Sequence, residues 1–196
     1  TATQLSAFDD LVERRKEGEP IAYLIEQQGF WSLDLRVLPT TLIPRPETEL
    51  LVEQALAFLS AKPQSEVLDL GTGTGAIALA MAKELPEAKV LGVDINHASI
   101  ALAKDNAARN NIGNVSFKQS SWYTELAGLF DLIISNPPYI RTDDPHLSQG
   151  DVRFEPARAL VAGTDGLADL RIIISEAPAY LQAGGALMVE HGYDQK

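Results

Sequence analysis

The chain has 196 residues, 45% hydrophobic and 22% charged, which is typical of a folded globular protein and excludes a disordered one. Its 16 Lys and Arg against 27 Asp and Glu give a formal net charge of −11, which excludes nucleic-acid binding by general positive charge but leaves a local basic patch open. The absence of cysteine excludes disulfides and thiolate chemistry. No apolar run approaches the ~18 residues of a membrane span and no signal pattern opens the chain, so we expect a cytoplasmic protein without a membrane partner.

The first 60 residues predict two helices separated by a hairpin and a loop. Apolar side chains at helical spacing predict a helix over Gln4–Glu17, which Gly18 ends. The alternating, aromatic stretch at residues 30–37 predicts strands in a β-hairpin, and the prolines that follow predict a loop. Pro46 suits the first turn of a second helix. We expect that helix to bury Leu50, Leu51, Ala55, Phe58 and Leu59.

From residue 66 onward, strand patterns alternate with helix patterns. This alternation predicts an α/β fold with a mostly parallel, doubly wound sheet. The expected strands are Glu66–Leu70, Lys89–Ile95, Val115–Gln119, Phe130–Ser135 and Ala186–Glu190, and the expected helices are Ala76–Glu84, Ser99–Asn110 and Leu167–Leu181. Because the chain starts at Thr1 and stops just after a strand pattern, we expect it to be a piece of a longer protein.

A glycine-rich turn, Asp69-Leu-Gly-Thr-Gly-Thr-Gly75, follows the first of these strands and opens a helix. Glycine allows tight turns and close approach of the backbone to a ligand. The spacing is GxGxG and not the GxGxxG of dinucleotide binders. Asp94 ends the next strand, where an acid can accept hydrogen bonds from both ribose hydroxyls of a nucleoside. Together the two features favour a bound nucleoside over a plain turn with a helix cap.

The run Asn136-Pro137-Pro138-Tyr139 follows a buried strand. Its two prolines fix the backbone and remove two N–H donors, which leaves the carbonyls of Asn136 and Pro137 free to accept. A rigid acceptor pair beside an amide and an aromatic ring suits the binding of a planar NH2 group. Ligands of such sheets bind at the carboxyl ends of the strands, which favours this interpretation over a simple proline-rich turn.

The GxGxG turn, the acid and the NPPY run together resemble the S-adenosylmethionine-dependent amino-methyltransferases. Three further runs resemble the HemK/PrmC family: LIPRPETE at residues 42–49, FEP at 154–156 with its following AL and GTDGL, and GEPIAY at 18–23. This family comprises the protein-(glutamine-N5) methyltransferases, which modify the glutamine of the GGQ motif in class-1 peptide chain release factors.

The resemblance implies a Rossmann-like methyltransferase fold, S-adenosylmethionine as cofactor with S-adenosylhomocysteine as product, and a release factor as protein partner. It also implies three parts: residues 1–18 as a remnant of a helical N-terminal domain, 19–45 as a linker with the hairpin, and 46–196 as the methyltransferase domain, whose last strands would lie beyond the chain. The linker sequence at 26–29 lacks the earlier glycine that the family often has.

The resemblance also implies roles for single residues. The cofactor would be held by Gly71, Thr72, Gly73, Thr74, Gly75, Asp94, Trp122 and Asn136, and the substrate amide by Asn136, Pro137, Pro138 and Tyr139. Of these, Asn136, Pro137 and Tyr139 would be catalytic, with Tyr139 packed on the substrate amide. Ser121 stands where the family often has an acid for the adenine amino group, so how adenine is held stays open.

An amide nitrogen is a poor nucleophile, so we expect catalysis by positioning and by oriented acceptors, with no general base and no metal. We expect His97, His146 and His191 to be surface or capping residues. Two alternatives stay open: a nucleic-acid adenine-N6 or guanine-N2 methyltransferase, and a non-catalytic S-adenosylmethionine-binding module. The net charge and the LIPRPETE run disfavour the first, and the intact NPPY run the second. A nicotinamide dehydrogenase is less favoured because the GxGxxG spacing is missing.

Overall fold

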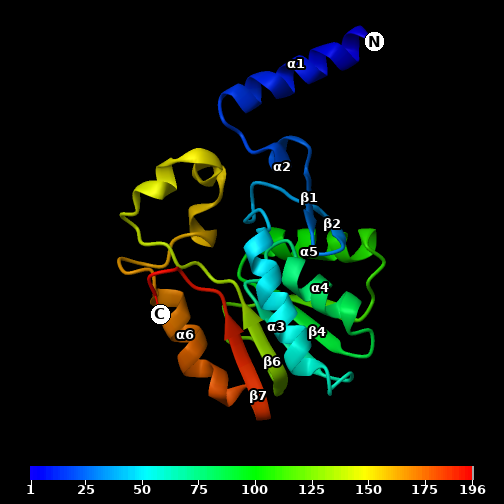
Figure 1. Ribbon diagram of the computed structural model, residues 1–196, viewed down its shortest axis with the longest axis vertical. Helices are drawn as coiled ribbons and strands as arrows, with labels where there is room; N and C mark the ends of the chain where they lie inside the picture. The colour runs from blue at the N-terminus through cyan, green and yellow to red at the C-terminus, as the bar shows by residue number, and fades with distance from the viewer. Residues whose placement is uncertain (196) are drawn as a thin grey trace.

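The computed structural model describes residues 1–195 and contains a five-stranded sheet in which every neighbouring pair of strands is parallel (Figure 1). The strand order is β5-β4-β3-β6-β7. The strands are β3 (Glu66–Leu70), β4 (Lys89–Asp94), β5 (Val115–Gln119), β6 (Phe130–Ser135) and β7 (Leu181–Val189). The expectation of a parallel α/β sheet is therefore confirmed.

Helices cover both faces of the sheet because its central strands are apolar on both sides. Alternate residues Val67, Leu132 and Ile134 join one core with the helices on one face, whereas Leu68 and Ile133 join a second core on the other. The first face carries α3 (Glu49–Leu59), α4 (Ala76–Glu84) and α5 (His97–Arg109), and the second carries α6 (Ala168–Glu176). This arrangement is the doubly wound one that the sequence predicts.

The last helix and the last strand differ from their expected bounds. The helix expected over Leu167–Leu181 ends at Glu176 and passes into the short 3-10 turn η5 (Ala177–Ala179). Pro178 lies in this turn, and proline removes a donor that a continuing helix would need. The strand expected over Ala186–Glu190 instead starts at Leu181, and its pairing with β6 contains a register irregularity. Gly184 has a φ of +78°, so the strand bends there and its first residues do not show a regular strand pattern in the sequence.

The expected buried face of α3 is only partly correct. Ala55 and Leu59 are fully buried, and Val52 joins them. Leu50 and Phe58 were expected to be buried, but they are 61% and 37% exposed. Residues 52, 55 and 59 are three and four positions apart, so they lie on the same face of the helix and pack against the sheet. Leu50 and Phe58 lie on other faces of the helix.

The N-terminal segment comprises α1 (Ala2–Lys16), α2 (Ile21–Leu24) and the antiparallel hairpin of β1 (Gln27–Phe30) with β2 (Leu33–Arg36). Helix α1 stands away from the sheet in Figure 1, and none of its residues is buried. A hairpin is present as expected, but only β2 lies within the predicted stretch 30–37, and β1 begins earlier, at Gln27. The hairpin lies against α4 and α5, and its Phe30, Leu33 and Leu35 belong to the core on that face of the sheet.

Asn106 on α5 ties the hairpin to the glycine-rich turn. Its Oδ1 accepts from the backbone N of Arg36 at 2.7 Å, and its Nδ2 donates to the Arg36 carbonyl at 3.0 Å. The same Nδ2 donates to the carbonyl of Thr74 at 2.9 Å. Because the Asn106 side chain is buried, these bonds form without competition from water.

Short 3-10 turns make up much of the remaining described chain: η1 (Pro46–Thr48), η2 (Pro145–Ser148), η3 (Gly150–Phe154) and η4 (Ala157–Ala159). Within residues 1–195, no helix combines the length and the apolar character that crossing a bilayer requires.

Candidate active site

A cavity of about 230 Å³ lies where β3, β4 and β6 end. The strand order reverses beside β3, because the chain adds β4 and β5 on one side and then returns to add β6 on the other. Crevices at such points are the usual ligand sites of open parallel sheets. The predicted residues that line the cavity are Gly71, Thr72, Gly73, Thr74, Asp94, Trp122, Asn136 and Pro138.

Three predicted site residues do not line this cavity: Gly75, Pro137 and Tyr139. Gly75 caps α4 with a φ of +85°, and a Cβ there would lie 3.1 Å from the Cβ of Ala103 and 3.2 Å from Leu79. Gly75 therefore serves the turn and the packing beneath it. Pro137 is buried, and Tyr139 is half-buried but is not among the residues that line the cavity.

The glycine-rich turn brings bare backbone to the cavity. Gly71 and Gly73 have φ values of +71° and +54°, which side-chain-bearing residues rarely adopt. The backbone N of Thr72 donates to the Val93 carbonyl at 2.8 Å, so the turn is held onto the end of β4. A Cβ on Gly71 would meet the Trp122 ring at 3.5 Å, so glycine at this position keeps the space between them open.

Asp94 fastens the turn from the neighbouring strand. One carboxylate oxygen accepts from the backbone N of Gly73 at 3.0 Å, and the other accepts from the backbone N of Asn96 at 2.8 Å. Burial raises the pKa of this carboxyl, while these hydrogen bonds and the charge of Arg158 oppose the rise. Since a carboxylate offers about four acceptor sites, both oxygens keep capacity for hydroxyl donors in the cavity.

Asp69 lies beneath the turn and was not singled out from the sequence. It is fully buried, and its Oδ2 accepts from the Thr72 hydroxyl at 2.6 Å and from the backbone N of Ala78 at 3.2 Å. Its Oδ1 has no hydrogen-bond partner within the described chain. Burial is the main cause that raises the pKa of Asp69 to about 7. In the sequence, its position two residues before Gly71 in the DLGTGTG run could have identified it as a residue of the site.

Trp122 and Asp169 also line the cavity, and the Trp122 ring lies beside Gly71 of the turn. Trp122 has a φ of +48°, an uncommon value that directs the chain sharply after β5. Burial raises the pKa of the Asp169 carboxyl on α6, and the nearby ring N–H of Trp122 opposes the rise. Ser121 lines the cavity as well. An acidic side chain, that of Asp169, therefore does line the cavity, but it comes from α6 and not from position 121.

Asn136 follows β6 and lines the cavity at the end of the central strand. Its Nδ2 donates to the hydroxyl of Thr48 at 3.0 Å, and that hydroxyl donates to Glu190 Oε2 at 2.7 Å. The Tyr139 hydroxyl donates to Glu190 Oε1 at 3.2 Å. Burial and the charge of Glu190 raise the pKa of Tyr139 to about 12, so it is neutral at pH 7. Sequence reasoning identified neither Thr48 nor Glu190 as a site residue.

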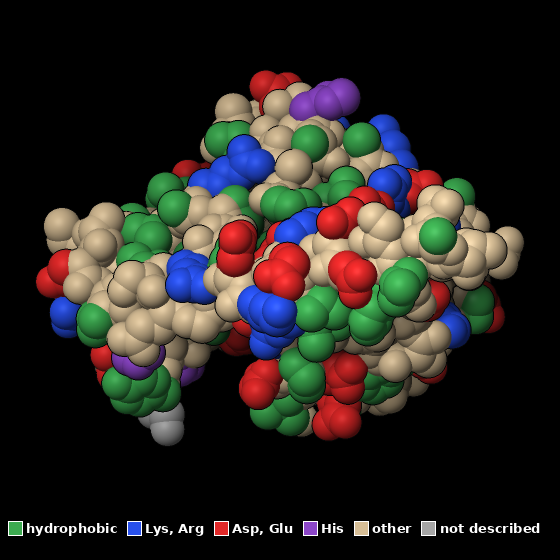
Figure 2. Space-filling view, turned by 90° about the horizontal axis from the view of Figure 1, so that it is seen from above, with side chains coloured by type: hydrophobic (Ala, Val, Ile, Leu, Met, Phe, Trp, Pro, Cys, Tyr) green, Lys and Arg blue, Asp and Glu red, His purple; other side chains and the backbone are tan. Residues whose placement is uncertain are grey.

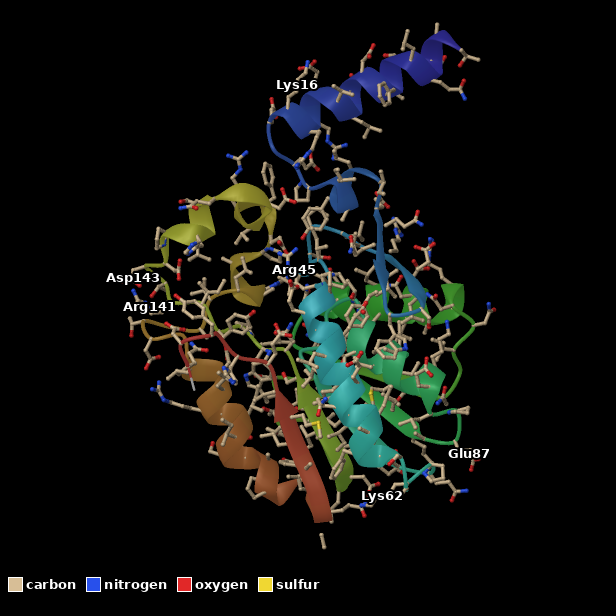
Figure 3. The ribbon with its side chains drawn as sticks, in the orientation of Figure 1. Lys16, Arg45, Lys62, Glu87, Arg141 and Asp143 are labelled. Carbon is tan, nitrogen blue, oxygen red and sulfur yellow. The ribbon has the colours of Figure 1, made fainter. Side chains whose placement is uncertain are left out.

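Two loops at the mouth of the cavity are joined by a buried acid. Glu155, whose side chain is fully buried, accepts from the backbone N of Ile43 at 3.0 Å and pairs with Arg45. Figure 3 shows Arg45 above the first turn of α3, facing the segment around residue 150. Arg158 adds a second link by donating to the Thr40 carbonyl at 3.2 Å. Both arginines line the cavity.

The residues that line the cavity include no histidine and no lysine. His97, His146 and His191 are all exposed. Across residues 1–195, no group of three or more His, Asp and Glu side chains is placed to hold a metal ion. The ionisable side chains on the cavity wall are Asp94, Asp169, Arg45 and Arg158, so its chemistry depends on hydrogen bonds and fixed charges.

The family profile described as "Methyltransferase small domain" matches residues 46–162. The release factor glutamine methyltransferase of Yersinia pestis is 57% identical over 195 residues, which is 100% of this chain and 70% of that protein. The protein of the same description from Aliivibrio fischeri is 56% identical over 194 residues, 98% of this chain and 68% of that protein.

Two solved structures show the same fold. The ribosomal protein L11 methylase from Lactobacillus delbrueckii subsp. bulgaricus has a TM-score of 0.55 at 25% identity and covers 76% of this chain and 62% of its own. A methyltransferase from Pyrococcus furiosus has a TM-score of 0.56 at 21% identity and covers 91% of this chain and 77% of its own.

Proposed function

This chain belongs to the release factor glutamine methyltransferase family, and from that premise we propose that it methylates the side-chain amide nitrogen (N5) of the glutamine in the GGQ motif of class-1 release factors, with S-adenosylmethionine as methyl donor. The observation that carries the proposal is the Asn136 side chain at the cavity wall, held by its NH2 group. We also propose that the methyltransferase domain begins at residue 46, where the profile match begins.

The cavity fits S-adenosylmethionine on three observations. Asp94 keeps acceptor capacity for the two ribose hydroxyls. Gly71 and Gly73 bring backbone without side chains to the cavity, where the methionine part would lie. Trp122 lines the cavity beside Gly71 and offers an aromatic ring to the adenine. When bound, the cofactor supplies an electrophilic methyl group on a sulfonium.

The residues around Asn136 act by positioning and by electrostatics. A glutamine amide nitrogen is a weak nucleophile because its lone pair is delocalised into the carbonyl. We assign the Oδ1 of Asn136, a residue that lines the cavity, as the acceptor for one of the nitrogen's two N–H groups. For the other we propose the carbonyl of the adjacent Pro137, although Pro137 is buried and does not itself line the cavity. These bonds strengthen as positive charge develops on the nitrogen, which lowers the barrier, and they hold the nitrogen in line. Tyr139, with its pKa near 12, is neutral at pH 7 and does not act as the base, so the nitrogen would give up one proton to solvent as S-adenosylhomocysteine leaves.

The charge distribution favours a protein substrate over a nucleic acid. The net charge is −11, and Figure 2 shows basic and acidic side chains interspersed on the face it presents, with no extended basic patch there. A glycine-flanked glutamine can enter a narrow cavity directly, whereas a duplex base must first be flipped out at a cost of about a few kcal/mol.

The direct test is mass spectrometry of a release factor incubated with this protein and S-adenosylmethionine. We expect a gain of one methyl group on the GGQ peptide, and no gain in a release factor whose GGQ glutamine is alanine. We expect Asn136→Ala to reduce the rate at least ~100-fold, because positioning and oriented acceptors are the main catalytic devices. Gln54→Ala, exposed on α3 and outside the cavity, serves as the control for loss of an amide side chain. Methyl groups found on DNA or RNA, or on the alanine variant, would contradict the assignment.

A further inference from the structure

Three side chains from distant parts of the chain meet beside Asn136, and one of them, Thr48, also lines the cavity. Thr48 ends the 3-10 turn before α3, Glu190 directly follows β7, and Tyr139 follows the two prolines. The contacts run in series, from Asn136 to Thr48 at 3.0 Å, from Thr48 to Glu190 at 2.7 Å and from Tyr139 to Glu190 at 3.2 Å. Thr48 is only 4% exposed, so water does not substitute for these partners.

The direction of each hydrogen bond follows from counting protons. The Glu190 carboxylate can only accept, so it takes the single hydroxyl proton of Thr48 on one oxygen and that of Tyr139 on the other. With its proton committed, the Thr48 oxygen can only accept from Asn136. The Asn136 group that faces Thr48 must therefore be the NH2, since an amide oxygen has no proton to give.

The opposite end of the Asn136 amide is its oxygen. No donor within residues 1–195 is bonded to this Oδ1, and it is not among the buried polar atoms without a partner. Asn136 lines the cavity, so Oδ1 is available there as an acceptor. If the amide were reversed, its NH2 would face the cavity and would repel a substrate NH2 instead of binding it.

We infer that Thr48 and Glu190 are positioning residues that fix the orientation of the Asn136 amide, so that its oxygen and not its NH2 meets the substrate. The inference rests on the proposed function for the identity of that substrate as a primary amide. Tyr139 belongs to the same network, because its hydroxyl proton occupies the second oxygen of Glu190 and keeps the carboxylate from turning away. The raised pKa of Tyr139, about 12, preserves that proton across the neutral range.

Two near-isosteric substitutions test the role. Glu190→Gln leaves one carbonyl oxygen for two hydroxyl donors, and Thr48→Val removes the hydroxyl while keeping the shape. We expect each to lower kcat for methylation of the release factor about 10-fold or more, with KM and the affinity for S-adenosylhomocysteine changed less than about 2-fold, as suits the loss of about one hydrogen bond. Thr48→Ser keeps the hydroxyl and should restore most of kcat. Glu53→Gln, exposed on α3, is the matched control.

The double variant separates a shared role from two independent ones. Because both residues act through Asn136, the kcat losses of Thr48→Val and Glu190→Gln should not multiply when combined. Multiplied losses, a rate like that of the unsubstituted protein in either single variant, or no recovery in Thr48→Ser would each overturn the inference.

A measurement on the free protein separates this inference from the proposed function. In an ¹⁵N-labelled sample, the side-chain NH2 signals of Asn136 are assigned by their loss in Asn136→Ala. We expect through-space contacts from these protons to the Thr48 methyl group, and we expect the contacts to weaken in Glu190→Gln. Their absence in the unsubstituted protein would refute the orientation even if methylation proceeds. Their presence in a protein that methylates no release factor would uphold the orientation and refute the proposed function.

Discussion

Asp94 is the residue with the most direct proposed role in cofactor binding. In Asp94→Ala the carboxylate acceptors for the ribose hydroxyls are lost, and hydrogen bonds to charged groups contribute ~1.5–3 kcal/mol. We therefore expect S-adenosylhomocysteine to bind roughly 10- to 100-fold more weakly in calorimetry. Asp143→Asn, an exposed acid outside the cavity, should bind normally. An unchanged affinity in Asp94→Ala would refute the ribose assignment.

Asp69 gives the folded protein a pH dependence near neutrality. Its pKa is about 7 in the folded protein, against about 4 for an aspartate in an unfolded chain. Between these two values the folded state binds the extra proton, so the free energy of unfolding falls as the pH rises. The stabilising contribution is complete below about pH 4 and is lost as the pH passes through about 7, with ~4 kcal/mol as the upper limit.

We expect Asp69→Asn to remove this part of the pH dependence, because asparagine does not ionise. The measurement is urea unfolding of both proteins at intervals from pH 5 to pH 8. The unsubstituted protein should lose stability relative to the variant over that range. Parallel stability profiles would show that Asp69 does not titrate there. Asp143→Asn, an exposed acid, is the control and should track the unsubstituted protein.

At the residue scale, sequence reasoning identified the groups that carry a local signature. Asp94 ends a strand about 20 residues after a glycine-rich turn, and Asn136 precedes two prolines, so both are visible in a short window. Thr48 and Glu190 are 142 residues apart in the chain and gain their partners only through the fold. Thr48 lies within the LIPRPETE run, but that run does not show which of its residues reaches the cavity, and the residues beside Glu190 carry no comparable motif.

At the scale of elements, β4 approaches its neighbours so closely that it requires a glycine. A Cβ on Gly92 would lie 2.7 Å from two ring carbons of Phe117 and 2.7 Å from the Thr72 hydroxyl. We expect Gly92→Ala to destabilise the protein by ~1–3 kcal/mol, the usual range for overpacking. The measurement is chemical denaturation. Gly29→Ala is the matched strand control, because a Cβ there would have nothing within 4 Å. Equal stabilities of the two variants would contradict the close packing.

The strands predicted most accurately were those whose apolar residues follow one clear pattern in the sequence. β3, β5 and β6 have the expected bounds because each is a short, mainly apolar or alternating run with clear ends. The predicted start of β7, Ala186, lies five residues after its observed start at Leu181. The first half of the strand was missed because it contains Gly184 and Gly185 and pairs irregularly with β6. The bend depends on how β7 pairs with β6, and this pairing cannot be predicted from the residues of β7 alone.

At the scale of the whole molecule, Asn106 joins three elements that are separate in the sequence. Asn106→Ala would leave the backbone groups of Arg36 and the carbonyl of Thr74 without their partner. An unsatisfied buried group costs about 1–3 kcal/mol, so we expect lower stability and, because Thr74 belongs to the glycine-rich turn, weaker binding of S-adenosylhomocysteine.

Asn110→Ala is the control that distinguishes the two effects of Asn106. Asn110 also bonds the hairpin, through the backbone of Asp34, but it makes no bond to the glycine-rich turn. Calorimetry and thermal melting should therefore show reduced stability in both variants and reduced cofactor affinity only in Asn106→Ala. Equal affinities in the two variants would show that the turn does not depend on Asn106.

The bonds of Asn106 also make the hairpin and the glycine-rich turn two sites of one thermodynamic linkage. A binding partner that favours the hairpin in its docked position would raise the affinity for the cofactor by the same factor by which the cofactor raises the affinity for that partner. Reciprocity of this kind requires no movement of the sheet between the two sites. Any partner that binds the docked hairpin would thus tighten cofactor binding, and loss of the cofactor would weaken the binding of that partner.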